Sequence, residues 1–113
     1  MYTYPDVMIV CGDPASPEDD MVSHAVVIIE VLSPSIKNYD PGQKFQYYRM
    51  LPSLREYLTI AQDEMHVERW TGQENGQWLL TEFNQASGPI ELGPIGVALN
   101  VADIYRRVNF AEQ

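Results

Sequence analysis

The stretch Ala25–Leu32 constrains the fold more than any other, because it is apolar throughout except for one carboxylate, Glu30. A strand this apolar is typically buried on both faces at the centre of a sheet. An ionised carboxylate in such a strand is costly unless it is paired, hydrogen-bonded or bound to a metal. The sequence therefore predicts a central strand whose Glu30 has a salt-bridge partner, a hydrogen-bond network or a metal ion, and it leaves these three alternatives open.

The composition limits the kind of protein that can carry this strand. With 113 residues, the chain is long enough for one domain with a single core. Its formal net charge of −9 argues against non-specific nucleic-acid binding through a basic surface but is compatible with a buried metal site. The single cysteine, Cys11, excludes an intramolecular disulfide framework and suits a reducing compartment. No signal-peptide pattern is present, and every apolar run is far shorter than the roughly 20 residues needed to span a bilayer. We expect a cytoplasmic protein with no membrane partner.

Turn residues divide the first half of the chain into two strands and a helix. The first strand is expected over residues 5–11, with Asp6 near its start, and the second is Ala25–Leu32. A helix is predicted to begin with Asp40 as N-cap and Pro41 at the first helical position, and to end where Pro52 stops it. Two apolar strands in succession thus each carry one acidic residue near an end.

The second half is predicted to be an antiparallel meander followed by a short helix. Alternating polarity and turn signals predict strands over 56–61, 66–70, 77–83 and 90–92, and helical spacing predicts a helix over 101–108. Asn100 is the expected cap of that helix. We expect Trp70 and Trp78 to face each other across the meander as sheet packing.

The first two predicted strands and the predicted helix supply three charged residues that could form one site: Asp6, Glu30 and Lys44. If the two strands are neighbours, both carboxylates lie near one edge of the sheet and the helix can lay its first turn over them. Neighbouring carboxylates repel and raise one pKa unless a cation lies between them. A divalent cation such as Mg²⁺, which takes oxygen ligands and keeps several waters, would relieve the repulsion. Lys44 would then either stabilise negative charge that develops on a phosphate or orient the attacking water.

Simpler interpretations compete with a metal site. Asp6 can cap a turn at the start of its strand, and Glu30 can be a buried acid in a structural ion pair with Lys44. His24 and His66 lack the spacing of paired metal ligands, so we expect each to be a surface or interface histidine.

Several segments together resemble a known nuclease family. They are Pro5–Val7, Val27–Ser35, Asp40, Lys44, Tyr48 and Pro52–Leu58. With these residues the chain resembles, over essentially its whole length, the Uma-two family, a mainly cyanobacterial group of restriction endonucleases in the PD-(D/E)XK nuclease superfamily. The resemblance implies an α/β (α+β) domain: a restriction-endonuclease-like mixed sheet with a helix after the second strand, an antiparallel meander and a short C-terminal helix.

The resemblance also implies the site and its cofactor. Asp6 and Glu30 match the acidic metal ligands of the family, and the backbone carbonyl of Val31 would be a further ligand for Mg²⁺ or Mn²⁺. The substrate implied is DNA, which such an enzyme hydrolyses at its phosphodiester bonds. Asp6, Glu30 and Lys44 are therefore the predicted catalytic residues.

The lysine departs from the common superfamily pattern. That pattern has a lysine two residues after the glutamate, where this chain has Leu32. The chain is similar to nucleases in which the lysine has migrated to the following helix, and Lys44 is the matching residue. Tyr48, one helical turn later on the same face, is expected to help position the lysine side chain without binding the metal itself.

Members of the family usually have a further N-terminal portion before the strand that carries Asp6. We therefore expect residues 1–113 to form a single domain that is N-terminally incomplete, and to self-associate, most simply as a dimer. Two functions follow as alternatives. The first is a metal-dependent endonuclease, and the second is a non-catalytic, self-associating remnant of such a nuclease that acts as an interaction or structural protein.

Overall fold

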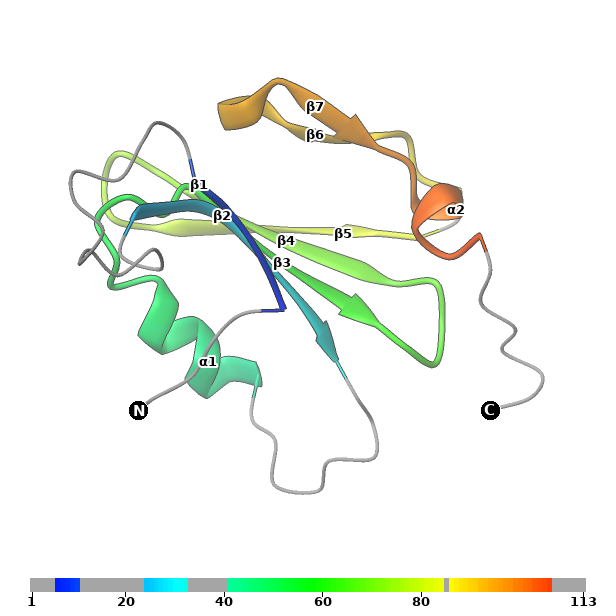
Figure 1. Cartoon of the computed structure of the whole chain (residues 1–113), viewed down its shortest axis with the longest axis horizontal. Helices are drawn as coiled ribbons and strands as arrows, with labels where there is room; N and C mark the ends of the chain where they lie inside the picture. Colours follow the sequence, from blue (N-terminus) through cyan, green and yellow to red (C-terminus); the bar gives the residue numbers. More distant parts are fainter. Residues whose placement is uncertain (1–5, 11–23, 33–40, 85, 107–113) are drawn as a thin grey trace.

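The computed structural model describes residues 6–10, 24–32, 41–84 and 86–106, and it shows a mixed α+β domain (Figure 1). One five-stranded sheet contains β1 (Val7–Val10), β2 (Ala25–Leu32), β3 (Glu56–Ala61), β4 (Val67–Gly72) and β5 (Trp78–Phe83). The helix α1 (Pro41–Tyr48) joins β2 to β3. The chain then forms β6 (Ile90–Leu92), a 3-10 helix (Gly93–Ile95), β7 (Val97–Leu99) and α2 (Val101–Ile104). The fold class predicted from the sequence is confirmed.

The five strands lie in the sheet in the order in which they occur along the chain. β2 pairs antiparallel with β1 and parallel with β3, and its parallel partner is reached through α1. The pairs β3–β4 and β4–β5 are antiparallel, which confirms the predicted meander. β6 and β7 form a separate antiparallel pair. The carboxyl end of β2 therefore has a strand on each side.

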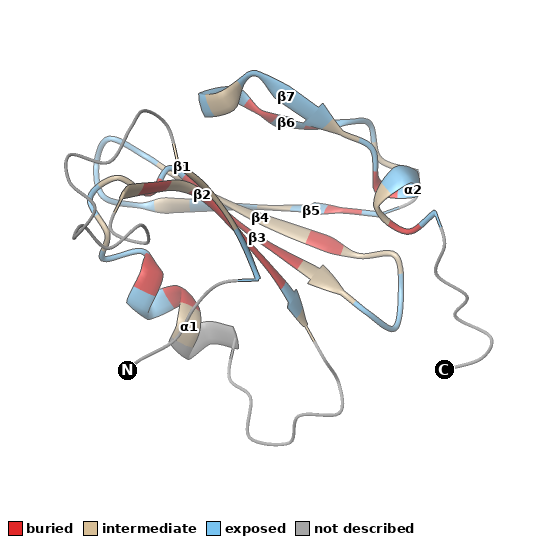
Figure 2. Cartoon of the chain, in the orientation of Figure 1, coloured by how far each residue is buried: buried red, intermediate tan, exposed pale blue. Residues whose placement is uncertain are grey.

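The sheet is covered on both faces, as the apolar character of β2 requires. Figure 1 shows α1 on one face and the β6–β7 pair with α2 on the other. Figure 2 shows that buried residues concentrate on β2 and β3, and Val27 and Ile28, which point to opposite faces, are both fully buried. The expectation that Ala25–Leu32 is a strand buried on both faces is confirmed.

The core on the α1 side is organised around the ring of Phe45. Its centroid lies 5.1 Å from that of Tyr57, 4.8 Å from that of Trp70 and 5.4 Å from that of Trp78. Both tryptophans thus contribute to packing as expected, but they do not face each other. The residue directly opposite Trp70 is Leu80, and the residue opposite Trp78 is Gly72.

The core on the opposite face is aliphatic and joins the sheet to β6, β7 and α2. Its buried members are Val27, Ile29, Leu58, Val67, Phe83, Ile90, Leu92, Val101 and Tyr105. One polar pair borders this core: Glu56 is 3% exposed, and its Oε1 lies 3.8 Å from Nε of the partly buried Arg69. The β6–β7 pair and α2 are therefore held to the sheet by a second apolar core.

Several predicted boundaries differ from the observed ones. Asp6 lies before β1 rather than within it, and α1 ends at Tyr48, before the turn that leads to Pro52. Asn100 is at the N-cap of α2 with an extended backbone, but its side chain makes no capping bond and instead donates to Asp103. The predicted cap Asp40, Cys11, and residues 107–108 of the predicted C-terminal helix lie outside the described residues. No helix within the described ranges has the length and apolar character that a membrane crossing requires.

Candidate metal and catalytic centre

A row of polar residues crosses the sheet on the face that α1 covers. Strand register aligns Glu30 with Thr59, Thr59 with Glu68, and Glu68 with Glu82. Continuing the β1–β2 register by one residue places Asp6 beside Glu30. Register partners share a face of the sheet, so these five side chains form one row on it. We call this set the polar row: Asp6, Glu30, Thr59, Glu68 and Glu82.

Asp6 lies directly before β1 and is held against the end of β2. Its Oδ2 accepts a hydrogen bond of 2.7 Å from the backbone N–H of Val31. The side chain of Asp6 is thus fixed beside Glu30 by the backbone of the residue that follows Glu30. Capping of a turn, the simpler interpretation of Asp6, does not account for a bond that joins residues 25 positions apart.

Glu30 is 1% exposed, and its two carboxylate oxygens differ in their surroundings. Oε2 lies 3.2 Å from Nζ of Lys44, whereas Oε1 is buried and has no hydrogen-bond partner among the described residues. Burial raises the pKa of the Glu30 carboxyl, and Lys44 opposes this rise. The neighbouring Asp6 carboxylate adds to the rise through its charge and through a hydrogen bond with the protonated form of Glu30. The predicted ion pair between Glu30 and Lys44 is present, and it leaves one carboxylate oxygen unsatisfied.

Lys44 reaches Glu30 from the first turn of α1. Phe45 and Tyr48 are buried against the sheet, and Tyr48 lies 6.0 Å from Tyr57 between ring centroids. This packing holds α1 so that the Lys44 side chain, which is 19% exposed, ends beside Glu30. Lys44 therefore places its ammonium group beside the buried carboxylate of Glu30.

The donors fit a hard divalent cation. Two carboxylates lie together, and the buried Oε1 of Glu30 lacks the partner that a metal ion would supply. An unpartnered buried carboxylate oxygen costs about 1–3 kcal/mol or more. The role of the Val31 backbone carbonyl as a further metal ligand stays a prediction. The same holds for Tyr48, whose packing behind Lys44 is compatible with a supporting role.

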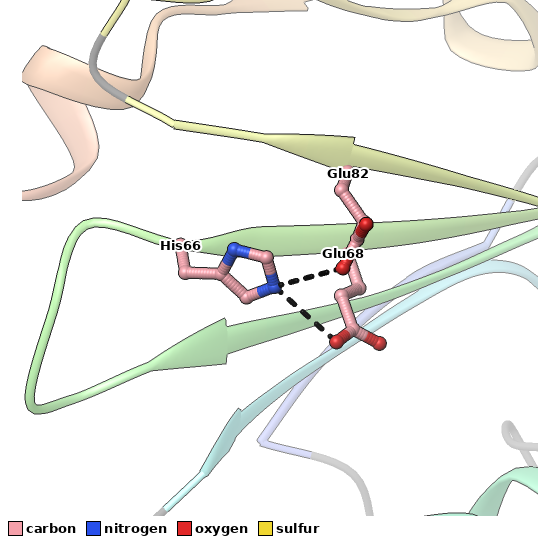
Figure 3. Close-up of side chains that lie close together, drawn as sticks. All are labelled: His66, Glu68 and Glu82. Carbon is pink, nitrogen blue, oxygen red and sulfur yellow. Dashed lines mark hydrogen bonds and ion pairs between the residues drawn. The ribbon is translucent and has the colours of Figure 1, made fainter.

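Sequence reasoning missed a second cluster at the other end of the polar row. Figure 3 shows His66, Glu68 and Glu82 converging, with Nε2 of His66 lying 3.3 Å from Oε1 of Glu68 and 3.5 Å from Oε1 of Glu82. These side chains form a group whose donor atoms could hold a metal ion. The available signal was the spacing of His66 and Glu68, which are two apart in the predicted strand 66–70 and hence expected on one face. Their meeting with Glu82 depends on the β4–β5 register, which spacing alone does not give.

A mixed sheet that gathers two carboxylates and a lysine at the end of one strand is the arrangement of a restriction-endonuclease-like domain. The family model Uma2, described as "Putative restriction endonuclease", matches residues 1–102. The chain belongs to this family, as its resemblance in sequence predicted. Membership indicates nuclease activity at the level of the family.

Two curated relatives come from the cyanobacterium Synechocystis sp. (strain ATCC 27184 / PCC 6803 / Kazusa). Uncharacterized protein slr1290 is 34% identical over 109 residues, which cover 96% of this chain and 57% of the relative. Uncharacterized protein sll1609 is 40% identical over 92 residues, which cover 80% of this chain and 52% of the relative. The chain thus spans about half the length of these relatives.

Proposed function

We propose that the protein is a metal-dependent endonuclease that hydrolyses DNA phosphodiester bonds, with Mg²⁺ or Mn²⁺ held by Asp6, Glu30 and the Val31 carbonyl. The observation that carries the proposal is the buried Glu30 carboxylate, which has Lys44 on one oxygen and no hydrogen-bond partner among the described residues on the other. A structural ion pair alone would leave that second oxygen unexplained. Membership of the Uma2 family supports phosphodiester hydrolysis as the reaction.

Each residue has a separate task in this mechanism. A divalent cation, when bound, would polarise the phosphate and lower the pKa of a bound water. Asp6 and Glu30 would hold this cation, and the Val31 N–H, which donates to Asp6, fixes the Asp6 carboxylate beside Glu30. Lys44 presents a positive charge beside the bound phosphate, where negative charge develops during in-line attack by water. Phe45 and Tyr48 position Lys44 by anchoring α1.

Cleavage of a mixed-sequence plasmid tests the proposal. The unaltered protein should cleave with Mg²⁺ or Mn²⁺ and should stop when the metal is chelated. Lys44→Ala should lower the rate by about 10²–10³-fold, the typical effect of losing one group that stabilises transition-state charge. Arg106→Ala is the matched control, because Arg106 is exposed on the far side of the sheet and pairs with Asp103. Equal rates for the Lys44→Ala protein and the unaltered one would refute the assignment.

The second candidate is a non-catalytic protein that acts by self-association. It is favoured by exposed apolar side chains on β5, where Leu79 is 58% and Leu80 is 40% exposed. Among the described strands, β5 pairs only with β4, so its other edge has backbone groups available for pairing. A dimer by light scattering that dissociates in Leu79→Lys, in a protein without metal-dependent cleavage, would favour this candidate over the endonuclease.

A further inference from the structure

The cluster of His66, Glu68 and Glu82 offers three metal-binding atoms on two adjacent strands. His66 directly precedes β4, Glu68 lies on β4 and Glu82 on β5. One donor atom from each side chain lies within 4.8 Å of the others, and Figure 3 shows both carboxylates directed at the same imidazole nitrogen. The side chains of His66, Glu68 and Glu82 are 31%, 33% and 61% exposed, so ions can reach them from solvent.

The two carboxylates of this cluster lie where they should repel each other. Glu68 and Glu82 are direct cross-strand partners, and like charges at such positions are destabilising. Across the described part of the chain, neither is paired with a lysine or an arginine. The imidazole Nε2 can carry only one hydrogen, and at 3.3 and 3.5 Å it makes a long contact with each carboxylate. A cation between the three groups would satisfy all of them.

Two of the three distances between donor atoms match the coordination shell of zinc, and the third, between the two glutamates, is within 4.8 Å. With metal–ligand bonds of about 2.0–2.1 Å, two ligands of a tetrahedral site lie about 3.3–3.4 Å apart. The distances from Nε2 to the two Oε1 atoms are 3.3 and 3.5 Å. One imidazole with two carboxylates favours a transition metal such as Zn²⁺ over Mg²⁺, which prefers oxygen ligands alone. Three protein ligands leave a fourth position for water.

The backbone that carries these ligands is fixed from the opposite core. The Tyr105 hydroxyl lies 2.6 Å from the Ala61 carbonyl, 3.1 Å from the His66 carbonyl and 3.4 Å from the His66 N–H. Burial raises the pKa of the Tyr105 phenol, which keeps its proton for donation to a carbonyl. Tyr105 thus holds the β3–β4 turn at His66, and the β4–β5 register fixes the two glutamates.

We propose that His66, Glu68 and Glu82 form a binding site for a zinc-like transition metal, separate from the Asp6–Glu30 centre. Thr59 on β3 lies between Glu30 and Glu68 in the polar row. At about 4.7–4.9 Å per strand, the Cα atoms of Glu30 and Glu68 are roughly 10 Å apart. The cluster is therefore a second site that ties β4 to β5, and it does not depend on the endonuclease function.

Metal titration in a Glu30→Gln background tests this proposal, because that change disables the other site. Zn²⁺ binding is measured by calorimetry, and Co²⁺ is added separately as a probe whose visible absorption reports tetrahedral coordination. We expect one ion per chain. Binding should be at least tenfold weaker after adding His66→Gln or Glu82→Gln, and unchanged after adding Glu91→Gln. Glu91 is an exposed glutamate on β6 and controls for the loss of one charge.

Either of two results would overturn the proposal: no Zn²⁺ binding by the Glu30→Gln protein, or affinity that His66→Gln and Glu82→Gln leave unchanged. Thermal melting confirms that each variant is folded. If His66→Gln does not fold, Glu82→Gln decides the question, since Glu82 is largely exposed and its replacement by glutamine preserves its shape. Because every variant keeps the Glu30→Gln change, the outcome is independent of whether the protein cleaves DNA.

Discussion

Glu30→Gln should abolish the stabilisation of the protein by Mg²⁺ while leaving the fold intact. Glutamine has the shape of glutamate, so the buried space beside Lys44 stays filled, but the charge that a cation needs is gone. For the unaltered protein, a Mg²⁺ concentration about tenfold above the Kd adds about 1.4 kcal/mol to the free energy of unfolding. In a domain of this size that gain corresponds to a rise in Tm of roughly 6 °C.

The same substitution separates the metal effect from the effect of pH. Burial raises the pKa of Glu30 in the folded protein above its ordinary value of 4.5. Between that value and the higher folded pKa, the folded state binds more protons than the unfolded state does, so metal-free stability falls as pH rises. Glu30→Gln should remove this fall. Added Mg²⁺ should oppose it in the unaltered protein, because a bound cation favours the ionised carboxylate.

Both effects are read by chemical denaturation across pH 4 to 8, with and without Mg²⁺. Glu91→Gln again provides the control, since it removes an exposed carboxylate and should keep both the Mg²⁺ effect and the pH dependence. An equal Mg²⁺ shift in the Glu30→Gln protein and the unaltered one would refute the role of Glu30 as a metal ligand. Parallel pH profiles would refute the argument from its burial.

Three further predictions concern stability. Tyr105→Phe removes the hydroxyl that fixes the β3–β4 turn and should lower the free energy of unfolding, measured in urea, by about 1–3 kcal/mol. Tyr47→Phe, at a residue 37% exposed, should lower it by less than about 0.5 kcal/mol. Equal losses in the two variants would contradict the proposed role of the Tyr105 hydroxyl. Phe45→Ala should cost about 3–5 kcal/mol and alter tryptophan fluorescence, and an unchanged spectrum would contradict its packing against both indoles. Gly96→Ala should lower stability by about 1–2 kcal/mol because its φ is 68°. Gly88→Ala, where an added Cβ likewise meets nothing within 4 Å and φ is not positive, should cost nothing measurable.

The sequence predicted the fold best where a hydrophobic pattern had only one solution. The bounds of Ala25–Leu32, Glu56–Ala61 and Ile90–Leu92 are confirmed, because an unbroken apolar run or strict alternation is bounded by turn residues at each. Boundaries were less accurate at β4 and β5, where the turn residue Gly72 continues the strand by pairing with Trp78. Tertiary packing of the Trp78 ring over Gly72 outweighs the weak strand propensity of glycine there.

The candidate site likewise has one part that the sequence could predict and one part that it could not. The proximity of Asp6, Glu30 and Lys44 was predictable, because two successive strands that pair, followed directly by a helix, place their end residues close together. The second cluster was not predictable, because it depends on which residue of β5 lies opposite Glu68, and turn length must be known to within one residue to give that register. His66 was predicted to be a surface or interface histidine; it is partly exposed, as expected, and it also contacts two carboxylates.

The polar row also constrains how the strands can pair in error. A shift of one residue between two strands moves every side chain of the shifted strand to the other face. For β4, such a shift would turn Glu68 toward the aliphatic core beneath β6 and would turn Val67, now fully buried, toward the opposite face. The penalty for burying a lone carboxylate is several kcal/mol, comparable with the whole stability of a small domain. Glu68, proposed to bind metal in the folded protein, would therefore also guide strand alignment during folding, since a misaligned β4 buries a charge that the native alignment leaves partly exposed.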